Sequence, residues 1–294
     1  MVALKRLLVA TDFSAMACHA VERASLIARK TGASLDLIHV ARAEPFDALR
    51  RFADGDFDDT AQARLEAIGE GLQQQAALVL ARHELTSNTH VAGGSLIAEI
   101  ISHARALPAD LIVLGFCGAS LMRHFLLGST AERMITKAVC PLLVVKQAAD
   151  AHYRSVLVPV DFSPISLPTL VRARAIAPDA EIVVQHVLAV PFESKLQYAG
   201  VARETIYHHR IAARRQATTE LLELCHAAQL PSQQTRLLVS HGHPSSQIVR
   251  QQRSDHCDLI AIGKQGEYAL ENLLIGSVTR QVVAKSQCDV LITV

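Results

Sequence analysis

The feature that most constrains this chain is an internal repeat, in which one unit of about half the chain occurs twice. The run Leu7–Ser14 reads LLVATDFS and returns as VLVPVDFS at Val156–Ser163. The run Asp110–Val144 aligns without a gap on Asp258–Ile292, with about eleven identities in some thirty-five positions. The chain of 294 residues is therefore expected to form two related domains.

The sequence predicts these domains at residues 1–147 and 153–294, both of them α/β. In each copy, short β-branched apolar runs alternate with longer amphipathic segments, which is the pattern of parallel strands joined by helices. The expected strands lie near residues 5–11, 34–40, 88–92, 111–115 and 141–146 in the first copy and 154–160, 181–187, 235–240, 258–263 and 289–294 in the second.

The first helix of each copy has recognisable ends. Ser14 is the expected N-cap in the first copy, and Gly32 is the expected stop. In the second copy, Pro164, Pro168 and Pro178 are expected to shorten the corresponding helix.

Composition limits the partners and the location. The formal net charge is +1, which offers no electrostatic attraction for nucleic acid or an anionic membrane surface. No apolar run approaches the ~18 residues of a membrane span, and the apolar stretch after Lys5-Arg6 is too short for a signal peptide. The six cysteines contain no C-x-x-C pair, which favours reduced thiols and a cytoplasmic protein.

Each copy also carries the same glycine spacing directly after its fourth expected strand. The first copy reads G-F-C-G, nine residues and then G-S-T, and the second reads G-K-Q-G, nine residues and then G-S-V. These positions are Gly115, Gly118, Gly128, Ser129 and Thr130 in the first copy and Gly263, Gly266, Gly276 and Ser277 in the second. Glycine lets backbone N–H groups approach an anion, and the serine stands where a helix would begin, so the spacing suits a phosphate. The alternative is that the glycines only form tight turns and the serines only cap helices.

With an aspartate ending each first strand and His-Val near the end of each second strand, the sequence resembles a tandem universal stress protein of the UspA family. Both halves carry that family's G-2x-G-9x-G-[ST] signature, and the resemblance covers essentially the whole chain. It implies two tandem Rossmann-like domains, similar to adenine nucleotide alpha hydrolases, each with a five-stranded parallel sheet and helices on both faces. It also implies bound adenine nucleotide, and the expected ligand is ATP or another adenine nucleotide, with Mg²⁺.

Carried over by position, the resemblance places Asp12 and Val40 beside adenine and ribose in the first site, and Asp161 and Val187 in the second. The glycine-motif residues named above would surround the phosphates. Capping of the following helix is an alternative role for both aspartates, and the two roles can coexist. The sequence departs from the family pattern in two places, since Gly94-Ser95-Leu96 replaces the G-x-P kept at Gly242-His243-Pro244, and Val278 stands where the first copy has Thr130.

No sequence motif assigns a nucleophile or general base, because there is no G-x-S-x-G elbow, no Walker A lysine and no ordered carboxylate pair. The leading hypothesis is a nucleotide-binding stress or regulatory protein in which ATP occupancy acts as a switch, with at most slow hydrolysis. The alternatives are a slow ATP-hydrolysing enzyme and a protein-protein interaction scaffold that binds no nucleotide. A metal site at His241 and His243 is left open, because the sequence does not identify the third and fourth ligands that such a site needs.

Three further expectations concern the partners and the ligand. The two halves are expected to form an intramolecular pseudo-dimer through their last strands, Leu142–Lys146 and Val290–Val294, and a further homodimer and an unidentified protein partner are left open. ATP should bind better than adenosine, because most of the matched residues face phosphate. The N-terminal site should be the tighter one, because Gly115–Thr130 has a formal charge of +1 and Gly263–Val278 has −1.

Overall fold

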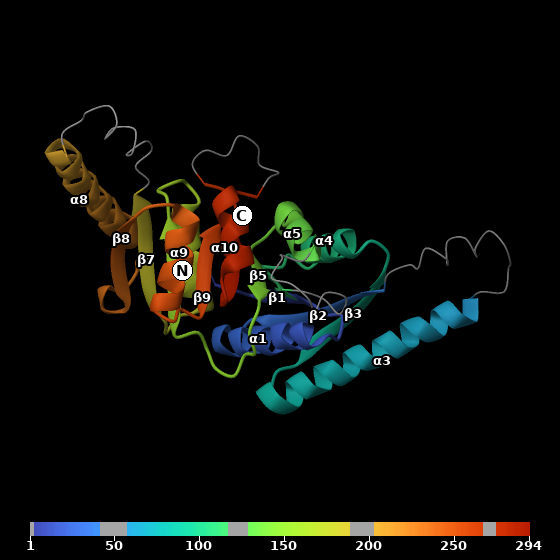
Figure 1. Cartoon of the computed structure of the whole chain (residues 1–294). Coiled ribbons are helices and arrows are strands. Elements are labelled where there is room, and N and C mark those ends of the chain that lie inside the picture. Colours follow the sequence, from blue (N-terminus) through green and yellow to red (C-terminus); the bar gives the residue numbers. More distant parts are fainter. Residues whose placement is uncertain (1–2, 42–57, 117–128, 189–202, 267–274) are drawn as a thin grey trace. The chain divides into compact units, whose positions relative to one another are not determined.

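The computed structural model describes residues 3–41, 58–116, 129–188, 203–266 and 275–294, and leaves aside the side chains at 58–62, 129 and 203–206. The chain divides into two compact units, Ala3–His152 and Tyr153–Thr293, which are described here one at a time. Both units are α/β and alternate strands with helices (Figure 1). The predicted domain boundaries and the predicted pairing of the halves stay predictions.

The N-terminal unit is built on five parallel strands in the order β3-β2-β1-β4-β5. In Figure 1, α1 and α3 lie on one face of this sheet, and α4 and α5 lie on the other. Its elements are β1 (Arg6–Ala10), α1 (Ala15–Thr31), β2 (Ser34–Ala41), α3 (Asp58–His83), β3 (Ser87–Gly93), α4 (Leu96–Ala106), β4 (Leu111–Gly115), α5 (Ser129–Lys137) and β5 (Leu142–Val145).

The C-terminal unit repeats this topology, with parallel strands in the order β8-β7-β6-β9-β10. Its elements are β6 (Ser155–Val160), α6 (Ser166–Ile176), β7 (Glu181–Leu188), α8 (Arg203–Ala227), a 3₁₀ turn (Ser232–Gln234), β8 (Thr235–His241), α9 (Pro244–Ser254), β9 (Leu259–Gly263), α10 (Ser277–Lys285) and β10 (Asp289–Thr293). The two five-stranded parallel sheets confirm the predicted fold class.

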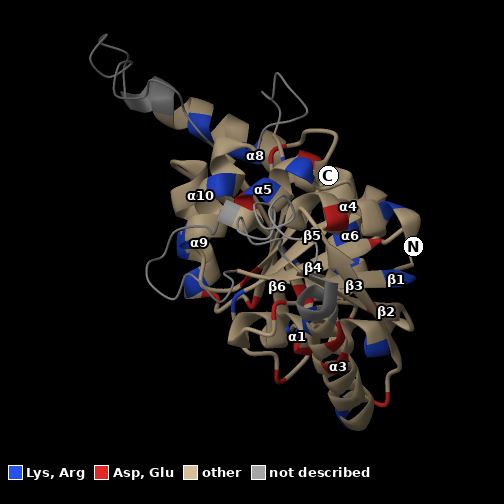
Figure 2. Cartoon of the chain, turned by 90° about the vertical axis from the view of Figure 1, so that its right-hand side faces the viewer, with Lys and Arg blue, Asp and Glu red and all other residues tan. Residues whose placement is uncertain are grey.

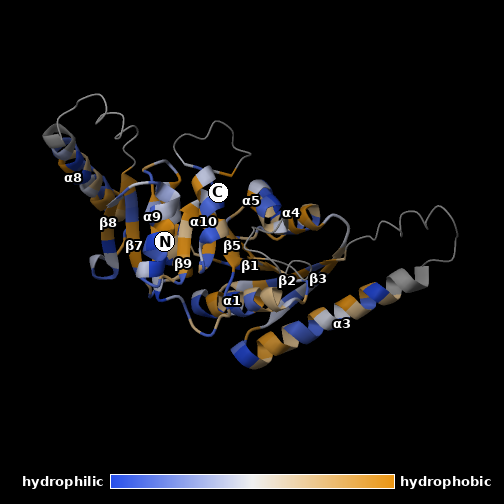
Figure 3. Ribbon diagram, viewed as in Figure 1, coloured by the Kyte–Doolittle hydropathy of each residue, from blue (hydrophilic) through white to orange (hydrophobic). Residues whose placement is uncertain are grey.

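The core of each unit lies along its central strands. In the N-terminal unit, Leu7, Leu8 and Val9 of β1 are fully buried, as are all four residues of β5. Figure 3 shows that the apolar residues are concentrated in the strands, while the helices alternate apolar and polar residues. A parallel strand is covered on both faces, so a continuous apolar run is the pattern that such a sheet selects.

The helix ends follow the sequence. The Ser14 side chain accepts a hydrogen bond from the Ala17 N–H at the start of α1, and Gly32 ends the helix with a left-handed φ of 74°. Helix α6 has 11 residues where α1 has 17, as expected from the prolines of the second copy. These expectations are confirmed because capping and proline chemistry act locally.

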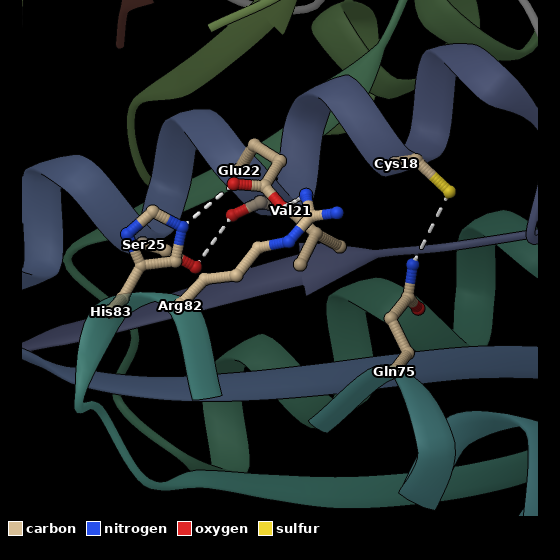
Figure 4. Close-up of polar contacts among 7 residues, drawn as sticks. All are labelled: Cys18, Val21, Glu22, Ser25, Gln75, Arg82 and His83. Carbon is tan, nitrogen blue, oxygen red and sulfur yellow. Dashed lines mark hydrogen bonds and ion pairs between the residues drawn. The ribbon is translucent and has the colours of Figure 1, made fainter. Parts of the chain in front are cut away.

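A polar contact between helices ties α1 to α3 in the N-terminal unit (Figure 4). In α1, Glu22 Oε1 accepts a hydrogen bond from Arg82 Nη1 at 2.9 Å, and Glu22 Oε2 lies 2.7 Å from His83 Nε2. Both carboxylate oxygens therefore contact α3. Further along the same pair of helices, Gln75 Nε2 lies 3.7 Å from Cys18 Sγ. Residues far apart in sequence thus fix the position of the 26-residue helix α3 against α1.

Charges of both signs are scattered over the helices (Figure 2). Of the helices in the described ranges, none combines the length and the hydropathy needed to cross a membrane.

Candidate functional site

In the N-terminal unit, three of the predicted ligand residues lie at the carboxyl edge of three neighbouring strands. Strand β1 lies between β2 and β4, with all three parallel. Asp12 follows β1, Val40 lies near the end of β2 with 7% of its surface exposed, and Gly115 is the last residue of β4. This edge is where open parallel sheets bind ligands.

The C-terminal unit brings the corresponding residues to the same edge. Strand β6 lies between β7 and β9, so Asp161 after β6 is flanked by Val187 of β7 and Gly263 at the end of β9. Val187 is half-buried, which leaves part of its apolar side chain accessible at the edge. The aspartate, the valine and the first glycine of the motif thus have the same arrangement at the strand edge in both units.

Glycine is required at several of these positions because the backbone is crowded there. A Cβ at Gly266 would collide with Oδ2 of Asp161, so the second glycine of the motif lies directly against this carboxylate. A Cβ at Gly263 would lie 2.5 Å from Cγ2 of Ile165, and one at Gly115 would lie 2.8 Å from the backbone carbonyl of Met16. In both units, therefore, the end of the fourth strand packs against the start of the first helix at a distance that only glycine allows.

The two parts of the C-terminal glycine motif, separated by nine residues in sequence, are hydrogen-bonded to one another. The Gly276 N–H donates to the Lys264 carbonyl at 2.9 Å, and the Thr279 hydroxyl donates to the Gly263 carbonyl at 2.7 Å. Ser277 then opens α10. The N-terminus of α10 consequently lies beside the turn that contains Gly263 and Gly266, and helix N-terminal N–H groups and glycine turns both favour anions.

The N-terminal motif is described only in part. Gly118 and Gly128 lie outside the described residues, while Ser129 begins α5 and Thr130 is half-buried in its first turn. The described part matches the C-terminal unit at the backbone, since the Phe116 N–H donates to the Val145 carbonyl at 2.8 Å and the Lys264 N–H donates to the Thr293 carbonyl at 2.7 Å.

Both aspartates organise the turn that leads into the first helix. Asp12 Oδ1 accepts the Ser14 N–H at 3.1 Å, and Asp161 Oδ1 accepts the Ser163 N–H at 3.1 Å. Asp161 Oδ1 also accepts the hydroxyls of Ser163 and Ser166. The N-caps of α1 and α6 are Ser14 and Ile165, so neither aspartate caps the helix that follows it, and the capping alternative is wrong. The role of the aspartates in binding adenine or ribose stays a prediction.

Each unit also places a lysine at the first glycine of the motif. Lys264 follows Gly263 directly and is 8% exposed, and its burial lowers the pKa of the ammonium group. In the other unit the matching residue is Phe116, and Nζ of Lys146 lies 4.6 Å from the centre of its ring. Sequence analysis did not single out Lys146 or Thr279, because each is brought to the site from another element.

The loop after the third strand has one conformation in both units, although only one copy has the proline. Gly94 has a φ of 139° and Gly242 a φ of 133°. The glycine alone thus reproduces this turn, and Pro244 adds a favourable first residue to α9.

Of the two histidines considered for a metal site, His241 ends β8, and His243 has a side-chain partner other than a metal ion. His243 Nδ1 lies 3.1 Å from the Ser245 hydroxyl, which donates to Gln281 Oε1 at 2.9 Å. Within the described ranges, no group of three or more His, Cys, Asp or Glu side chains is arranged to hold a metal ion.

Comparison with known proteins gives a family match for each half. The model of the family described as "Universal stress protein family" matches residues 3–146 and 152–293. The chain is 32% identical to universal stress protein MJ0531 of Methanocaldococcus jannaschii over 143 residues, which cover 49% of this chain and 82% of that protein. It is 27% identical to universal stress protein YxiE of Bacillus subtilis over 145 residues, which cover 48% of this chain and 98% of that protein.

Two solved structures share the fold over almost the whole chain. A putative universal stress protein from Pseudomonas aeruginosa superposes with a TM-score of 0.67 at 19% identity, covering 99% of this chain and 93% of its own. A universal stress protein from Archaeoglobus fulgidus gives a TM-score of 0.68 at 16% identity, covering 98% and 97%.

Proposed function

Because this chain belongs to the universal stress protein family and contains two tandem copies of its domain, we propose that each copy binds an adenine nucleotide at the carboxyl edge of its sheet. The proposed contacts to adenine and ribose come from Asp12 and Val40 in one copy and from Asp161 and Val187 in the other. The proposed phosphate contacts come from the glycine motif, at Gly115, Gly118, Gly128, Ser129 and Thr130 and at Gly263, Gly266, Gly276 and Ser277.

One observation carries this proposal. In the C-terminal unit, Gly263, Gly266 and Gly276 come together in space and lie beside the carboxylate of Asp161 and the first turn of α10. An acceptor for a hydroxyl or amino group is thereby placed next to backbone donors suited to an anion. A nucleoside phosphate carries both kinds of group.

We propose ATP with Mg²⁺ as the ligand and nucleotide occupancy as the regulatory signal of a cytoplasmic stress protein. Magnesium is commonly held through substrate phosphates and few protein carboxylates, so it would enter with the nucleotide. Hydrolysis is expected to be slow at most, because no sequence motif for a nucleophile or general base accompanies the glycine motif.

Calorimetric titration of the full chain with Mg²⁺-ATP and with adenosine tests this proposal. ATP is expected to bind more tightly than adenosine, since most proposed contacts are to phosphate. The matched pair of variants is Gly266→Val and Gly69→Val, because a Cβ at Gly69 meets no atom within 4 Å. Loss of one of the two binding events in the first variant, with retention of both in the second, supports the site.

Equal affinity for adenosine and ATP contradicts the phosphate contacts. Absence of binding by either ligand contradicts the proposed function and favours a scaffold role without nucleotide. A parallel assay of phosphate release separates a binding protein from an ATP-hydrolysing enzyme.

A further inference from the structure

Two phenylalanines at matching positions adopt an unusual backbone conformation. Phe13 has a φ of 61° and Phe162 a φ of 63°, and each directly follows the aspartate at the end of the first strand. A left-handed φ is uncommon for a residue other than glycine and is a true outlier for a bulky side chain. Its recurrence in both units indicates that this turn is a built feature of the domain.

The ring of each phenylalanine packs against the ring of a histidine from the neighbouring strand, stacked in the N-terminal unit and tilted in the C-terminal one. The Phe13 ring lies 4.8 Å from the His39 ring, with an angle of 15° between them, and the Phe162 ring lies 4.4 Å from His186 at 30°. His186 is itself held by a contact of 2.9 Å between Nδ1 and the Val160 carbonyl. The strained residue is thus anchored to the second strand of its unit.

In sequence, each phenylalanine lies between the aspartate and the serine that donates a hydrogen bond to the aspartate's carboxylate. In each unit the aspartate precedes it, and the serine that follows it donates its N–H back to that carboxylate. This return depends on the reversal of the chain at the phenylalanine, where the left-handed φ turns the backbone. The conformation of Phe13 and Phe162 therefore determines where the carboxylates of Asp12 and Asp161 point.

Simple core packing does not account for the pair in the N-terminal unit. The Phe13 residue is 38% exposed, and His39 is only half-buried. A ring with that much exposure contributes less to the hydrophobic core than the fully buried residues of β1. Its position between His39 and the backbone of α3 at Gly71 fixes a conformation more than it buries apolar surface.

We propose that the Phe13–His39 and Phe162–His186 ring pairs position the aspartates: they hold the left-handed turn so that the carboxylates of Asp12 and Asp161 meet the base or ribose of the nucleotide. The proposal rests on the proposed function for its ligand. It adds four positioning residues, Phe13, His39, Phe162 and His186, to the residues inferred from sequence.

The test compares alanine and glycine at position 162 in the full chain carrying Gly118→Val, so that binding to the C-terminal site is observed. Phe162→Ala removes the ring and keeps the steric cost of a left-handed residue, whereas Phe162→Gly removes both. ATP affinity is expected to fall about tenfold in Phe162→Ala and to recover in large part in Phe162→Gly. Phe162→Tyr, which keeps the ring, is expected to bind as the parent does. Leu221→Ala, which truncates a buried residue of α8, controls for loss of stability alone.

A second readout follows the turn without nucleotide. The chain has 8 phenylalanines, so selective ¹³C and ¹⁵N labelling resolves the backbone shifts of Phe162, and amide exchange reports on the Ser163 N–H. Phe162→Ala is expected to speed exchange of this amide, and Phe162→Gly to restore protection. Leu221→Ala should leave it protected.

The two readouts separate the two proposals. If no protein binds nucleotide but the Ser163 amide responds as expected, the proposed function fails and the stack still holds the turn. If the parent binds ATP and Phe162→Ala matches it in both affinity and amide exchange, the positioning proposal is overturned. Weaker binding by glycine than by alanine would show that ease of adopting the left-handed φ does not restore the site, and would also overturn the proposal.

Discussion

The turns Asp12–Ser14 and Asp161–Ser163 have the same backbone and different side-chain support. Asp161 Oδ1 accepts the hydroxyls of Ser163 and Ser166, whereas the position matching Ser166 is Ala17, which has no hydroxyl to donate. In the N-terminal unit Ser14 instead caps α1 by accepting from the Ala17 N–H. The comparison teaches that duplication preserved the strand edge and the turn, while the chemistry that stabilises them diverged.

The helices that follow the two turns, α1 and α6, also differ in the side-chain contacts that hold them. Glu22 ties α1 to α3 through Arg82 and His83, and the position matching Glu22 in α6 is Val171. The shorter α6 is fastened by other contacts, including a hydrogen bond between the Thr169 and Thr293 side chains. Two sites with one geometry are therefore expected to differ in stability and in affinity.

The largest expected effect comes from blocking one site at a time. Gly266→Val places a side chain against Asp161 and should abolish binding to the C-terminal site, and Gly118→Val should do so for the N-terminal one. Calorimetry should show loss of one of two sites in each variant. The tighter site should survive in Gly266→Val, because the N-terminal motif has the more positive formal charge. Survival of the tighter site in Gly118→Val would refute the charge argument.

A smaller effect is expected on stability when each aspartate is removed. Asp161→Ala should lower the free energy of unfolding of the chain by about 2 kcal/mol, because a buried serine pair loses its common acceptor. Asp12→Ala should cost about 1 kcal/mol, since the Ser14 cap of α1 remains. Chemical unfolding without nucleotide measures both values. Equal losses would show that the extra hydroxyl contacts add nothing.

The contacts of Glu22 that link α1 to α3 should contribute less to stability than the two aspartates do. Glu22→Gln is expected to lower the stability of the N-terminal unit by roughly 0.5–1 kcal/mol, because Arg82 is exposed and the pair with it is screened. Amide exchange resolved by residue should show faster opening in α3 and no change in α8. An effect that spreads equally to both units would contradict a local tie.

The smallest expected effect is a dependence on pH in the N-terminal unit. Burial lowers the pKa of His39, with the Thr11 backbone and Asp12 acting in the opposite direction. Burial and the stacked His90 lower the pKa of His103, and Asp36 acts in the opposite direction. The unfolded chain then binds more protons than the folded one, so stability is full above the ordinary histidine pKa of about 6.5 and declines as the pH falls below it. His103→Gln should flatten the decline seen in unfolding curves between about pH 7 and pH 5, and an unchanged slope would contradict this cause.

Sequence patterns predicted the fold because its determinants are local. The apolar runs around Leu7–Val9 and Leu142–Val145 mark strands covered on both faces, and Ser14 and Gly32 mark the ends of α1. The repeat then extended each assignment from one half to the other. For the candidate site, the structure places Asp12, Val40 and Gly115 at one strand edge, and Asp161, Val187 and Gly263 at the corresponding edge of the other unit, while their contact with a nucleotide stays a prediction.

The side-chain contacts that could not be predicted from the sequence depend on which strands are neighbours and on the register in which they pair. Phe13 reaches His39 because β1 pairs with β2, and Phe116 meets Lys146 because β4 pairs with β5. Neither histidine nor lysine carries a sequence signal for that contact. The left-handed φ of Phe13 and Phe162 runs against the ordinary preference of phenylalanine, so propensity alone would assign another conformation.

The central claim is that each copy of the domain holds one adenine nucleotide, and native mass spectrometry of the purified, undenatured chain tests it most directly. With Mg²⁺-ATP added, the spectrum is expected to show the chain with one and then two nucleotides, the second binding at higher concentration. Gly69→Val should behave as the parent, and Gly266→Val should stop at one nucleotide. A spectrum that shows only the bare chain at millimolar ATP would contradict the account.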